Sequence, residues 1–165
     1  MTSILLPTDL SPQSLYPIHE ICKKAGNDKC NIYIIHTLEM PSGIIDLLFL
    51  QEKKPYNKLK PQFLEAIEML KKKYSSVLNL LSFEFLWSNS RFFLRNYVEA
   101  RNIGAIYLLE GHDYQPALPQ SLDCISSLHK CRVPLVYVQK TSAGEYGTLT
   151  ALLYRGKRNL IEADH

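Results

Sequence analysis

The chain has 165 residues, which is enough for one domain with a sizeable hydrophobic core and too few for two ordinary domains. Hydrophobic residues make up 46% of the chain and charged residues 21%, which argues against a disordered chain, and the net charge of +3 is only a weak basic bias. The longest apolar runs are far shorter than the roughly 20 residues of a membrane span, and the N-terminus lacks a signal-peptide pattern, so we expect a cytoplasmic protein that contacts no membrane.

The start of the chain predicts a strand followed by a helix. The strand covers the apolar residues 4–7. The helix covers residues 12–25, with Ser11 as its N-cap and Gly26 just after its end. Pro17 lies early enough in this helix to be tolerated, at the cost of a bend in the first turn.

The middle of the chain continues the alternation of strands and helices. Residues 31–38 are rich in β-branched and aromatic side chains, which is typical of a strand. A variable insert over residues 39–57 contains an apolar stretch, 44–50, that predicts a short helix, and a long helix is expected over 59–74. We interpret its basic run, Lys71 to Lys73, as a solvated helix end and not as a nucleic-acid site, because no aromatic residues are interleaved with it.

The last part of the chain completes a doubly wound α/β fold. It predicts strands over 81–87, 104–109 and 133–138, and helices over 91–101 and 120–129. Strands that are apolar on both faces suit a five-stranded parallel sheet covered by helices on both faces. We therefore assign residues 1–139 to one domain and residues 140–165 to a C-terminal extension.

The four cysteines, Cys22, Cys30, Cys124 and Cys131, are interpreted as structural residues. Their spacing forms no CxxC pair, so we expect no metal site. Cys22 and Cys124 fall on the apolar faces of predicted helices, where a free thiol behaves as a small hydrophobic side chain.

Polar residues follow the first two strands at their carboxyl ends, where ligands bind in open α/β sheets. Pro7, Thr8 and Asp9 follow the first strand, and His36 and Thr37 end the second. The Asp9 carboxylate can accept hydrogen bonds from a ribose or a base amine, or it can brace the turn into the first helix. Residue chemistry alone leaves these two roles open.

Three further residues have the chemistry for catalysis but no supporting pattern. We interpret His36 as a hydrogen-bonded core residue, because the sequence shows no carboxylate or nucleophile pattern for a triad. His112 and Asp113 could flank a ligand after the fourth strand. A hydrolase that uses them would need a phosphate and metal site that the sequence does not show, so we expect no enzyme.

Four segments, residues 4–11, 34–37, 106–111 and 131–138, together resemble the universal stress protein family. They cover about residues 1–139 in the family's order and at its spacing. The resemblance implies an adenine nucleotide alpha hydrolase-like fold with sheet order 3-2-1-4-5. It also implies a homodimer in which the last strand, residues 133–138, pairs across a two-fold axis.

Many members of that family bind ATP through a loop after strand four with the pattern Gly-x2-Gly-x9-Gly-Ser/Thr. In this chain Gly111 matches the first glycine, but Tyr114 stands at the second and Gln120-Ser121 at the closing pair. The loop is also four residues shorter. Pro116 and Pro119 remove two further N–H donors that could face a phosphate.

The resemblance implies a degenerate nucleotide site. Within it, Ser121 is expected mainly to cap the helix that follows. Thr37 stands where the family usually has a valine. The candidate residues of the site are Pro7, Thr8, Asp9, Thr37, Gly111 and Ser121. We expect a regulatory or binding module of the stress response that needs no cofactor and does not bind ATP tightly. An AMP- or ATP-binding stress protein with an atypical phosphate site is the alternative, and the segments 39–57 and 140–165 are candidate surfaces for a protein partner.

Overall fold

A computed structural model describes residues 1–40, 42–43 and 54–140. Five parallel strands form one sheet in the order β3-β2-β1-β4-β5, as the resemblance implied. The strands are β1 (Thr2–Pro7), β2 (Cys30–Thr37), β3 (Leu78–Leu86), β4 (Ile103–Leu109) and β5 (Leu135–Val138). The predicted helix over 44–50 and the extension beyond residue 140 lie outside the described residues.

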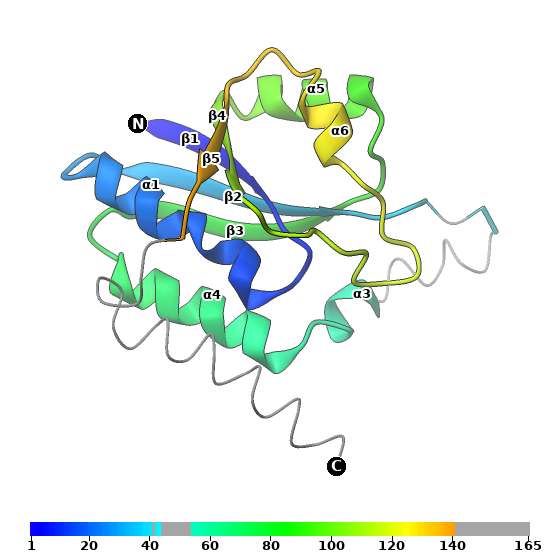
Figure 1. The fold of residues 1–165 in the computed structure, drawn as a ribbon, viewed down its shortest axis with the longest axis horizontal. Helices are drawn as coiled ribbons and strands as arrows, with labels where there is room; N and C mark the ends of the chain where they lie inside the picture. Colours follow the sequence, from blue (N-terminus) through cyan, green and yellow to red (C-terminus); the bar gives the residue numbers. More distant parts are fainter. Residues whose placement is uncertain (41, 44–53, 141–165) are drawn as a thin grey trace.

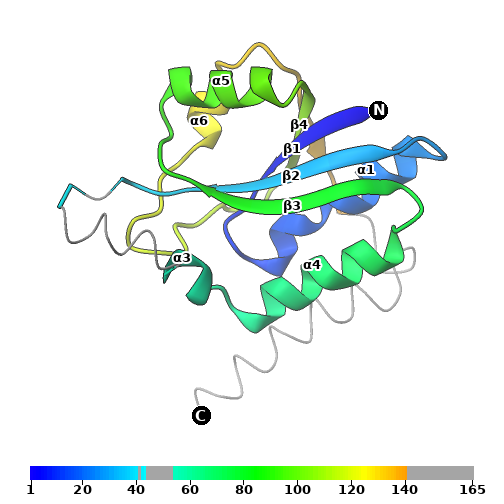
Figure 2. The same cartoon turned by 180° about the vertical axis from the view of Figure 1, so that it is seen from behind.

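Helices cover both faces of the sheet, as Figures 1 and 2 show. Those of the described residues are the 3₁₀ helix η1 (Pro12–Leu15) and the α-helices α1 (Pro17–Ala25), α3 (Lys54–Asn57), α4 (Pro61–Lys73), α5 (Arg91–Ala100) and α6 (Ile125–Leu128). Helices α1 and α4 lie on one face, and α5 and α6 on the other. The doubly wound fold predicted from the alternation of elements is therefore confirmed.

Each face of the sheet has its own hydrophobic core. Ile4 and Leu6 of β1 pack toward the side of α1 and α4, where Phe63 is completely buried. Leu5, which points to the opposite face, packs toward α5 with the buried Leu94. Side chains alternate across a strand, so a central strand that is buried on both faces must be apolar throughout.

The predicted helix over 12–25 is split at Pro17. Residues Pro12–Leu15 form a 3₁₀ turn, with Ser11 as its N-cap, and α1 begins at Pro17. Pro17 has no N–H to donate to residue 13, and its ring would crowd that carbonyl, so a continuous α-helix cannot form here. The other end is as predicted, since Gly26 ends α1 with a positive φ of 59° that favours glycine.

The predictions for the end of the domain need two corrections. The helix expected over 120–129 is only Ile125–Leu128, because the residues before it pair with the end of β2. The strand expected over 133–138 begins at Leu135. Pro134 lacks an N–H, and Val133 donates its own N–H to the Cys131 carbonyl in a turn (2.7 Å).

Candidate functional site

A cleft of about 240 Å³ opens at the carboxyl ends of β1 and β2, next to the segment that follows β4. Between β1 and β4 the strand order reverses, which is where open α/β sheets bind ligands. The cleft is lined by Pro7, Thr8, Asp9, His36, Thr37, Tyr114, Gln115, Pro116, Ser121, Leu122, Asp123, Cys124 and Ile125. The structure thus brings together five of the six candidate residues, and only Gly111 is not part of the lining.

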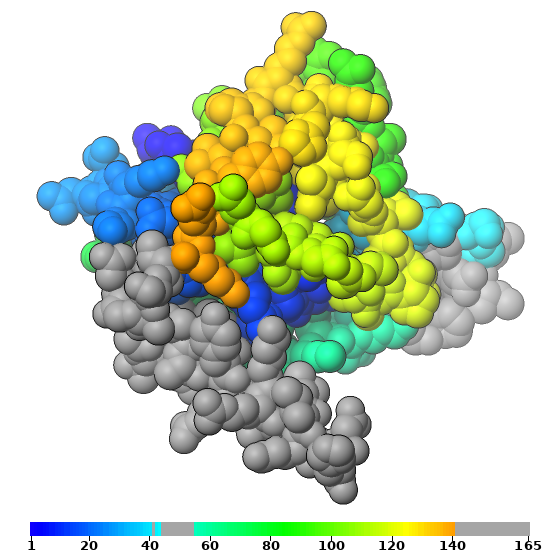
Figure 3. All heavy atoms as spheres, viewed as in Figure 1, coloured from blue at the N-terminus to red at the C-terminus, as the bar shows by residue number. Residues whose placement is uncertain are grey.

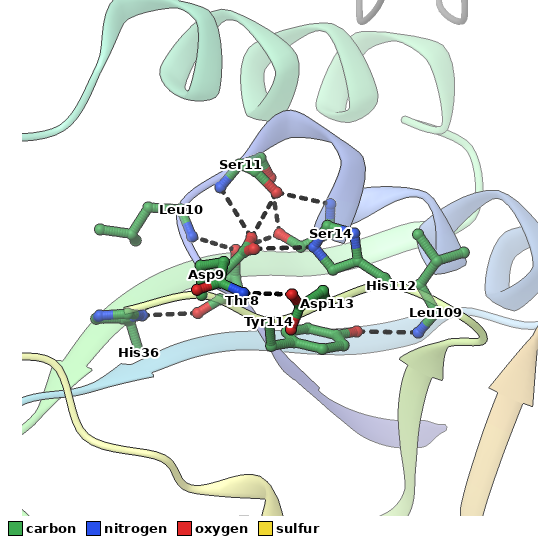
Figure 4. Close-up of polar contacts among 11 residues, drawn as sticks. Thr8, Asp9, Leu10, Ser11, Ser14, His36, Leu109, His112, Asp113 and Tyr114 are labelled. Atoms are coloured by element: carbon green, nitrogen blue, oxygen red, sulfur yellow. Dashed lines mark hydrogen bonds and ion pairs between the residues drawn. The ribbon is translucent and has the colours of Figure 1, made fainter. Parts of the chain in front are cut away.

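Asp9 is held by hydrogen bonds on both carboxylate oxygens (Figure 4). Its Oδ1 accepts from the backbone N–H (3.1 Å) and the hydroxyl of Ser11, and its Oδ2 lies 2.8 Å from Nε2 of His112. Burial raises the pKa of Asp9, but the hydrogen bonds from His112 and Ser11 outweigh it and lower the pKa to about 2. Asp9 is therefore a carboxylate whose two oxygens are already engaged.

The turn around Asp9 is built from local hydrogen bonds. The buried Thr8 accepts a hydrogen bond from the Leu10 N–H (3.0 Å) and shares another with the Ser14 hydroxyl. Leu10 has a positive φ of 64°, a conformation that costs a non-glycine residue on the order of 1 kcal/mol. The hydrogen bonds of Thr8 and Asp9 hold the chain in this turn, so the bracing role considered for Asp9 is present in the structure.

His36 is a buried residue with both ring nitrogens hydrogen-bonded, as the core interpretation predicted. Nδ1 lies 2.7 Å from the Thr8 carbonyl, which only accepts, so Nδ1 carries the proton. Nε2 lies 2.7 Å from the Ser121 hydroxyl and accepts from it. Burial lowers the pKa of His36, so the imidazole is neutral at pH 7.

Ser121 does not cap a helix, which corrects the expectation from the sequence. Its Oγ accepts from the Leu118 N–H (3.0 Å) and donates to His36. Helix α6 begins four residues later, where Asp123 accepts from the Ile125 N–H (2.9 Å). The Ser121 hydroxyl therefore joins the loop to β2 and is not presented at a helix N-terminus.

Thr37 ties the same segment to β2. Thr37 is only 1% exposed. Its hydroxyl donates to the Leu122 carbonyl (2.8 Å), and the Leu122 N–H donates back to the Thr37 carbonyl (2.9 Å). The Glu39 N–H donates to the Gln120 carbonyl (2.8 Å), and Leu38 and Ser121 form an antiparallel bridge. Residues 120–122 are thus paired with residues 37–39 in a short ladder.

Tyr114 occupies the position where the glycine-rich pattern has its second glycine. Its hydroxyl accepts from the Leu109 N–H (2.9 Å), and its ring packs edge-on against His112, with 4.7 Å between the ring centroids. Burial raises the pKa of Tyr114 to about 12. Figure 3 shows the segment that follows β4 in yellow-green across the front of the molecule, beside the blue atoms of the N-terminal segment.

The roles of His112 and Tyr114 as internal partners were not predicted from the sequence. His112 was considered only as a residue that flanks a ligand, and it lies 103 positions from Asp9. No local pattern signals such a pair, because a contact between two loops depends on how the sheet brings them together. Asp113 is exposed and bonds Gln115, so it lies outside the Asp9–His112 contact.

The four cysteines are free and buried, in keeping with their structural interpretation. Burial raises the pKa of the Cys22 thiol to about 12, which disfavours the reactive thiolate. In the described ranges no three histidine, cysteine, aspartate or glutamate side chains come together as a possible metal site. No helix in the same ranges is long and apolar enough to cross a membrane.

This geometry defines a class of proteins: five-stranded, doubly wound α/β domains with a cleft where the strand order reverses. Among solved structures, the universal stress protein UspA from Lactobacillus plantarum aligns with a TM-score of 0.56 and 12% identity, over 83% of this chain and 97% of that one. The hypothetical protein MJ0577 aligns with a TM-score of 0.54 and 14% identity, over 86% and 98% of the two chains. The chain therefore has the universal stress protein fold.

A universal stress protein solved in complex with cAMP also aligns, with a TM-score of 0.50 and 11% identity, over 85% of this chain and 98% of that one. No family model matches the sequence. No curated protein matches it either. The similarity is thus one of fold, and the function of this chain must be argued from its own site.

Proposed function

We propose that the chain is a universal stress protein-like regulatory or binding module that acts without catalysis and does not bind ATP tightly. The fold and the position of the cleft support a place in this family and a role in the stress response. The hydrogen bonds that engage Asp9 and Thr37 support a role as a binding module, because His112 and Ser11 hold the Asp9 carboxylate and the Thr37 hydroxyl donates to the Leu122 carbonyl.

The proposal rests on one observation, which concerns the backbone N–H groups that the segment from Gly111 to Ser121 can offer to a phosphate. A phosphate cradle needs several backbone N–H groups that converge on one point, usually at a helix N-terminus. Here Pro116 and Pro119 have no N–H, the chain at 120–122 is paired with β2, and α6 has only four residues. This segment offers little to the phosphates of ATP.

Isothermal titration calorimetry with ATP tests the proposal directly. We expect no binding at micromolar ATP, with or without Mg²⁺, and no ATP turnover above background. Micromolar affinity that depends on Mg²⁺ would contradict the proposal, because it would require a phosphate site in this segment.

The second candidate is an adenine-nucleotide binder with an atypical phosphate site. The cleft favours it, because Pro7, Thr8, Asp9 and Thr37, four of the candidate residues, line it. In this case Asp9→Ala should abolish AMP binding. Asp28→Ala is the matched control, since Asp28 is exposed at the opposite end of β2. If Asp9→Ala leaves the AMP affinity unchanged, this candidate must be dropped.

A homodimer through the last strand is part of the proposal. Among the described strands, β5 is an edge strand that pairs only with β4, and Tyr137 on it is 51% exposed. The backbone N–H and C=O groups of an edge strand can pair with a second copy of the chain. Light scattering should give twice the 19.0 kDa mass of one chain. Tyr137→Glu should shift the protein toward the monomer, whereas Phe92→Glu on α5 should not.

A further inference from the structure

Ser121 and His36, which both line the cleft, form a hydrogen-bonded pair of a nucleophile and a base. The Ser121 hydroxyl lies 2.7 Å from Nε2 of His36 and donates to it. A serine hydroxyl becomes a nucleophile when an adjacent base accepts its proton. The two residues are 85 positions apart, so this pair exists only in the folded chain.

The His36 ring is held in the tautomer that a base requires. Its Nδ1–H donates to the Thr8 carbonyl at 2.7 Å (Figure 4), which leaves the lone pair of Nε2 for the Ser121 proton. Burial lowers the pKa of His36, whereas the Thr8 carbonyl and the charge of Asp9 act in the opposite direction. The imidazole is therefore neutral at rest, and Asp9 stabilises the cation that forms when the proton arrives. An orienting acceptor and a nearby negative charge are what the third residue supplies in a serine triad.

The Ser121 oxygen keeps one lone pair for a bond to carbon. A hydroxyl oxygen has two acceptor positions. The Leu118 N–H, 3.0 Å away, uses one of them and stabilises the negative charge that develops as the proton leaves. In the part of the chain that the structure describes, no other donor bonds this oxygen. The geometry of the pair is thus suited to attack on an electrophilic carbon in the cleft.

The charges around the cleft select against anions. Asp9 and Asp123 contribute two carboxylates, and none of the described residues that line the cleft is a lysine or an arginine. An anionic reagent in this cleft faces negative charge without a cation to balance it. The electrophile must therefore be uncharged or cationic.

The size of the cleft limits the group that can reach Ser121. Its volume of about 240 Å³ lies below the roughly 300–1,000 Å³ of most ligand sites. Pro7, Pro116 and Ile125 supply apolar walls. These walls suit a short apolar acyl group.

We propose that Ser121 is a site of covalent acylation, where the cleft takes an activated ester or thioester of a short, uncharged carboxylic acid. The Ser121 oxygen forms a bond to the carbonyl carbon, and its proton passes to Nε2 of His36. The bond from that carbon to the leaving oxygen or sulfur breaks, the leaving group keeps the electron pair, and His36 returns the proton to it or to water. One such step consumes the serine and is not a catalytic cycle, so the inference goes beyond the proposed function without replacing it.

The test treats the full chain with p-nitrophenyl acetate and follows acetylation by intact-mass spectrometry and peptide mapping. We expect one acetyl group per chain, on Ser121, and a burst of one equivalent of p-nitrophenolate. Ser121→Ala should abolish both. Ser75→Ala is the matched control, because Ser75 is an exposed serine before β3, at the opposite end of the sheet, and it should leave both unchanged.

Two further arms test the base and the charge selection. His36→Gln should slow the acetylation of Ser121 on the order of a hundredfold, as expected for the loss of a general base. Circular dichroism and thermal unfolding of this variant separate the loss of the base from the loss of the fold. Acetyl phosphate offers the same acyl group on an anionic leaving group, and it should leave Ser121 unmodified.

Four outcomes overturn parts of the inference. Acetyl groups on exposed serines or lysines but not on Ser121 overturn the site, and this map needs no variant if His36→Gln fails to fold. Acetylation of Cys124 in place of Ser121 does the same, since Cys124 also lines the cleft and burial raises the pKa of its thiol to about 12. An unchanged rate in a folded His36→Gln overturns the role of His36, and equal reaction with acetyl phosphate overturns the selection against anions.

Failure of the proposed function has a different signature. Continuous release of many equivalents of p-nitrophenolate, lost in Ser121→Ala, would show catalysis and overturn the proposed non-catalytic role, while the acylation of Ser121 would stand. Absence of any acetyl group on Ser121 overturns the inference and leaves the proposed binding module untouched.

Discussion

At Asp9, short hydrogen bonds outweigh the electrostatic cost of burial. Burial alone would raise the pKa of this carboxyl, yet the donors of His112 and Ser11 stabilise the charged form and bring the pKa from 3.8 to about 2. A carboxyl whose pKa is lower in the folded state binds its proton more weakly there than in the unfolded chain. Its contribution to stability is complete above the unfolded pKa and is lost as the pH falls toward 2.

We therefore expect Asp9 to contribute about 2 kcal/mol to the free energy of unfolding above pH 5, and to lose roughly half of this by pH 3. Urea denaturation of the wild type and of Asp9→Asn over this pH range measures the difference. Asp28→Asn controls for the removal of an exposed carboxylate. A stability difference between the wild type and Asp9→Asn that does not change with pH would contradict the assignment.

His19 of α1 is a buried histidine that favours the neutral form. It is 1% exposed, its Nδ1 lies 2.5 Å from the Tyr74 hydroxyl, and its ring packs edge-on against Tyr16 and Tyr74. Burial, followed by the charge of Lys73, lowers its pKa to about 4, although Glu20 acts in the opposite direction. The unfolded chain therefore binds the proton more tightly than the folded protein does.

His19 should lower the free energy of unfolding by up to about 3 kcal/mol as the pH falls from 6.5 toward 4. Substitution of His19 by Gln removes the titrating group, so the variant should lose less stability over this range than the wild type. Urea unfolding midpoints at pH 7 and pH 4.5 provide the measurement. His129→Gln, at an exposed position, should behave like the wild type, and equal pH dependence in His19→Gln would refute the prediction.

At the scale of elements, the site is shaped by the short ladder between residues 37–39 and 120–122. Backbone hydrogen bonds at Thr37, Leu122 and Glu39 hold it, and the Thr37 hydroxyl adds a side-chain bond. The same residues cannot both pair with β2 and form the first turn of a helix. This competition explains why α6 is short and why Ser121 does not cap it.

Thr37→Val should loosen this ladder while the shape of the side chain is kept. The loss of one buried hydrogen bond is expected to cost about 1 kcal/mol of unfolding free energy. Amide hydrogen exchange at Leu122 should become faster, because the carbonyl and N–H of this residue both bond Thr37. Thr2→Val, at the exposed start of β1, is the control, and unchanged exchange at Leu122 would argue against the role of the hydroxyl.

At the scale of the whole molecule, one sheet separates two cores. Ile32 of β2 belongs to the core under α1 and α4, and Ile106 of β4 to the core under α5 and α6; both are completely buried. The central strand β1 contributes side chains to both cores. Loss of either core therefore removes support from the strand on which the other depends, and we expect a single cooperative unfolding transition.

Ile32→Val and Ile106→Val should each cost about 0.5–1.5 kcal/mol, the range for deletion of one buried methyl group. Because the two side chains lie on opposite faces of the sheet, the double variant should lose the sum of the two costs to within about 0.5 kcal/mol. Urea denaturation followed by fluorescence and circular dichroism tests this. Two separate transitions, or a large departure from additivity, would contradict the single cooperative unit.

The sequence alone determined the alternation of strands and helices, the doubly wound class and the edge of the sheet where the cleft lies, because apolar strands and turn residues act through neighbours a few positions away. Asp9 and Thr37 were found in this way, since Asp9 follows one strand and Thr37 ends another, and the carboxyl ends of the two strands meet. Only the tertiary structure decided that His112 hydrogen-bonds the Asp9 carboxylate and that the Ser121 hydroxyl hydrogen-bonds His36. Those contacts join residues 103 and 85 positions apart, so no local preference encodes them, and they arise only when the sheet brings β1, β2 and the loop after β4 to one edge.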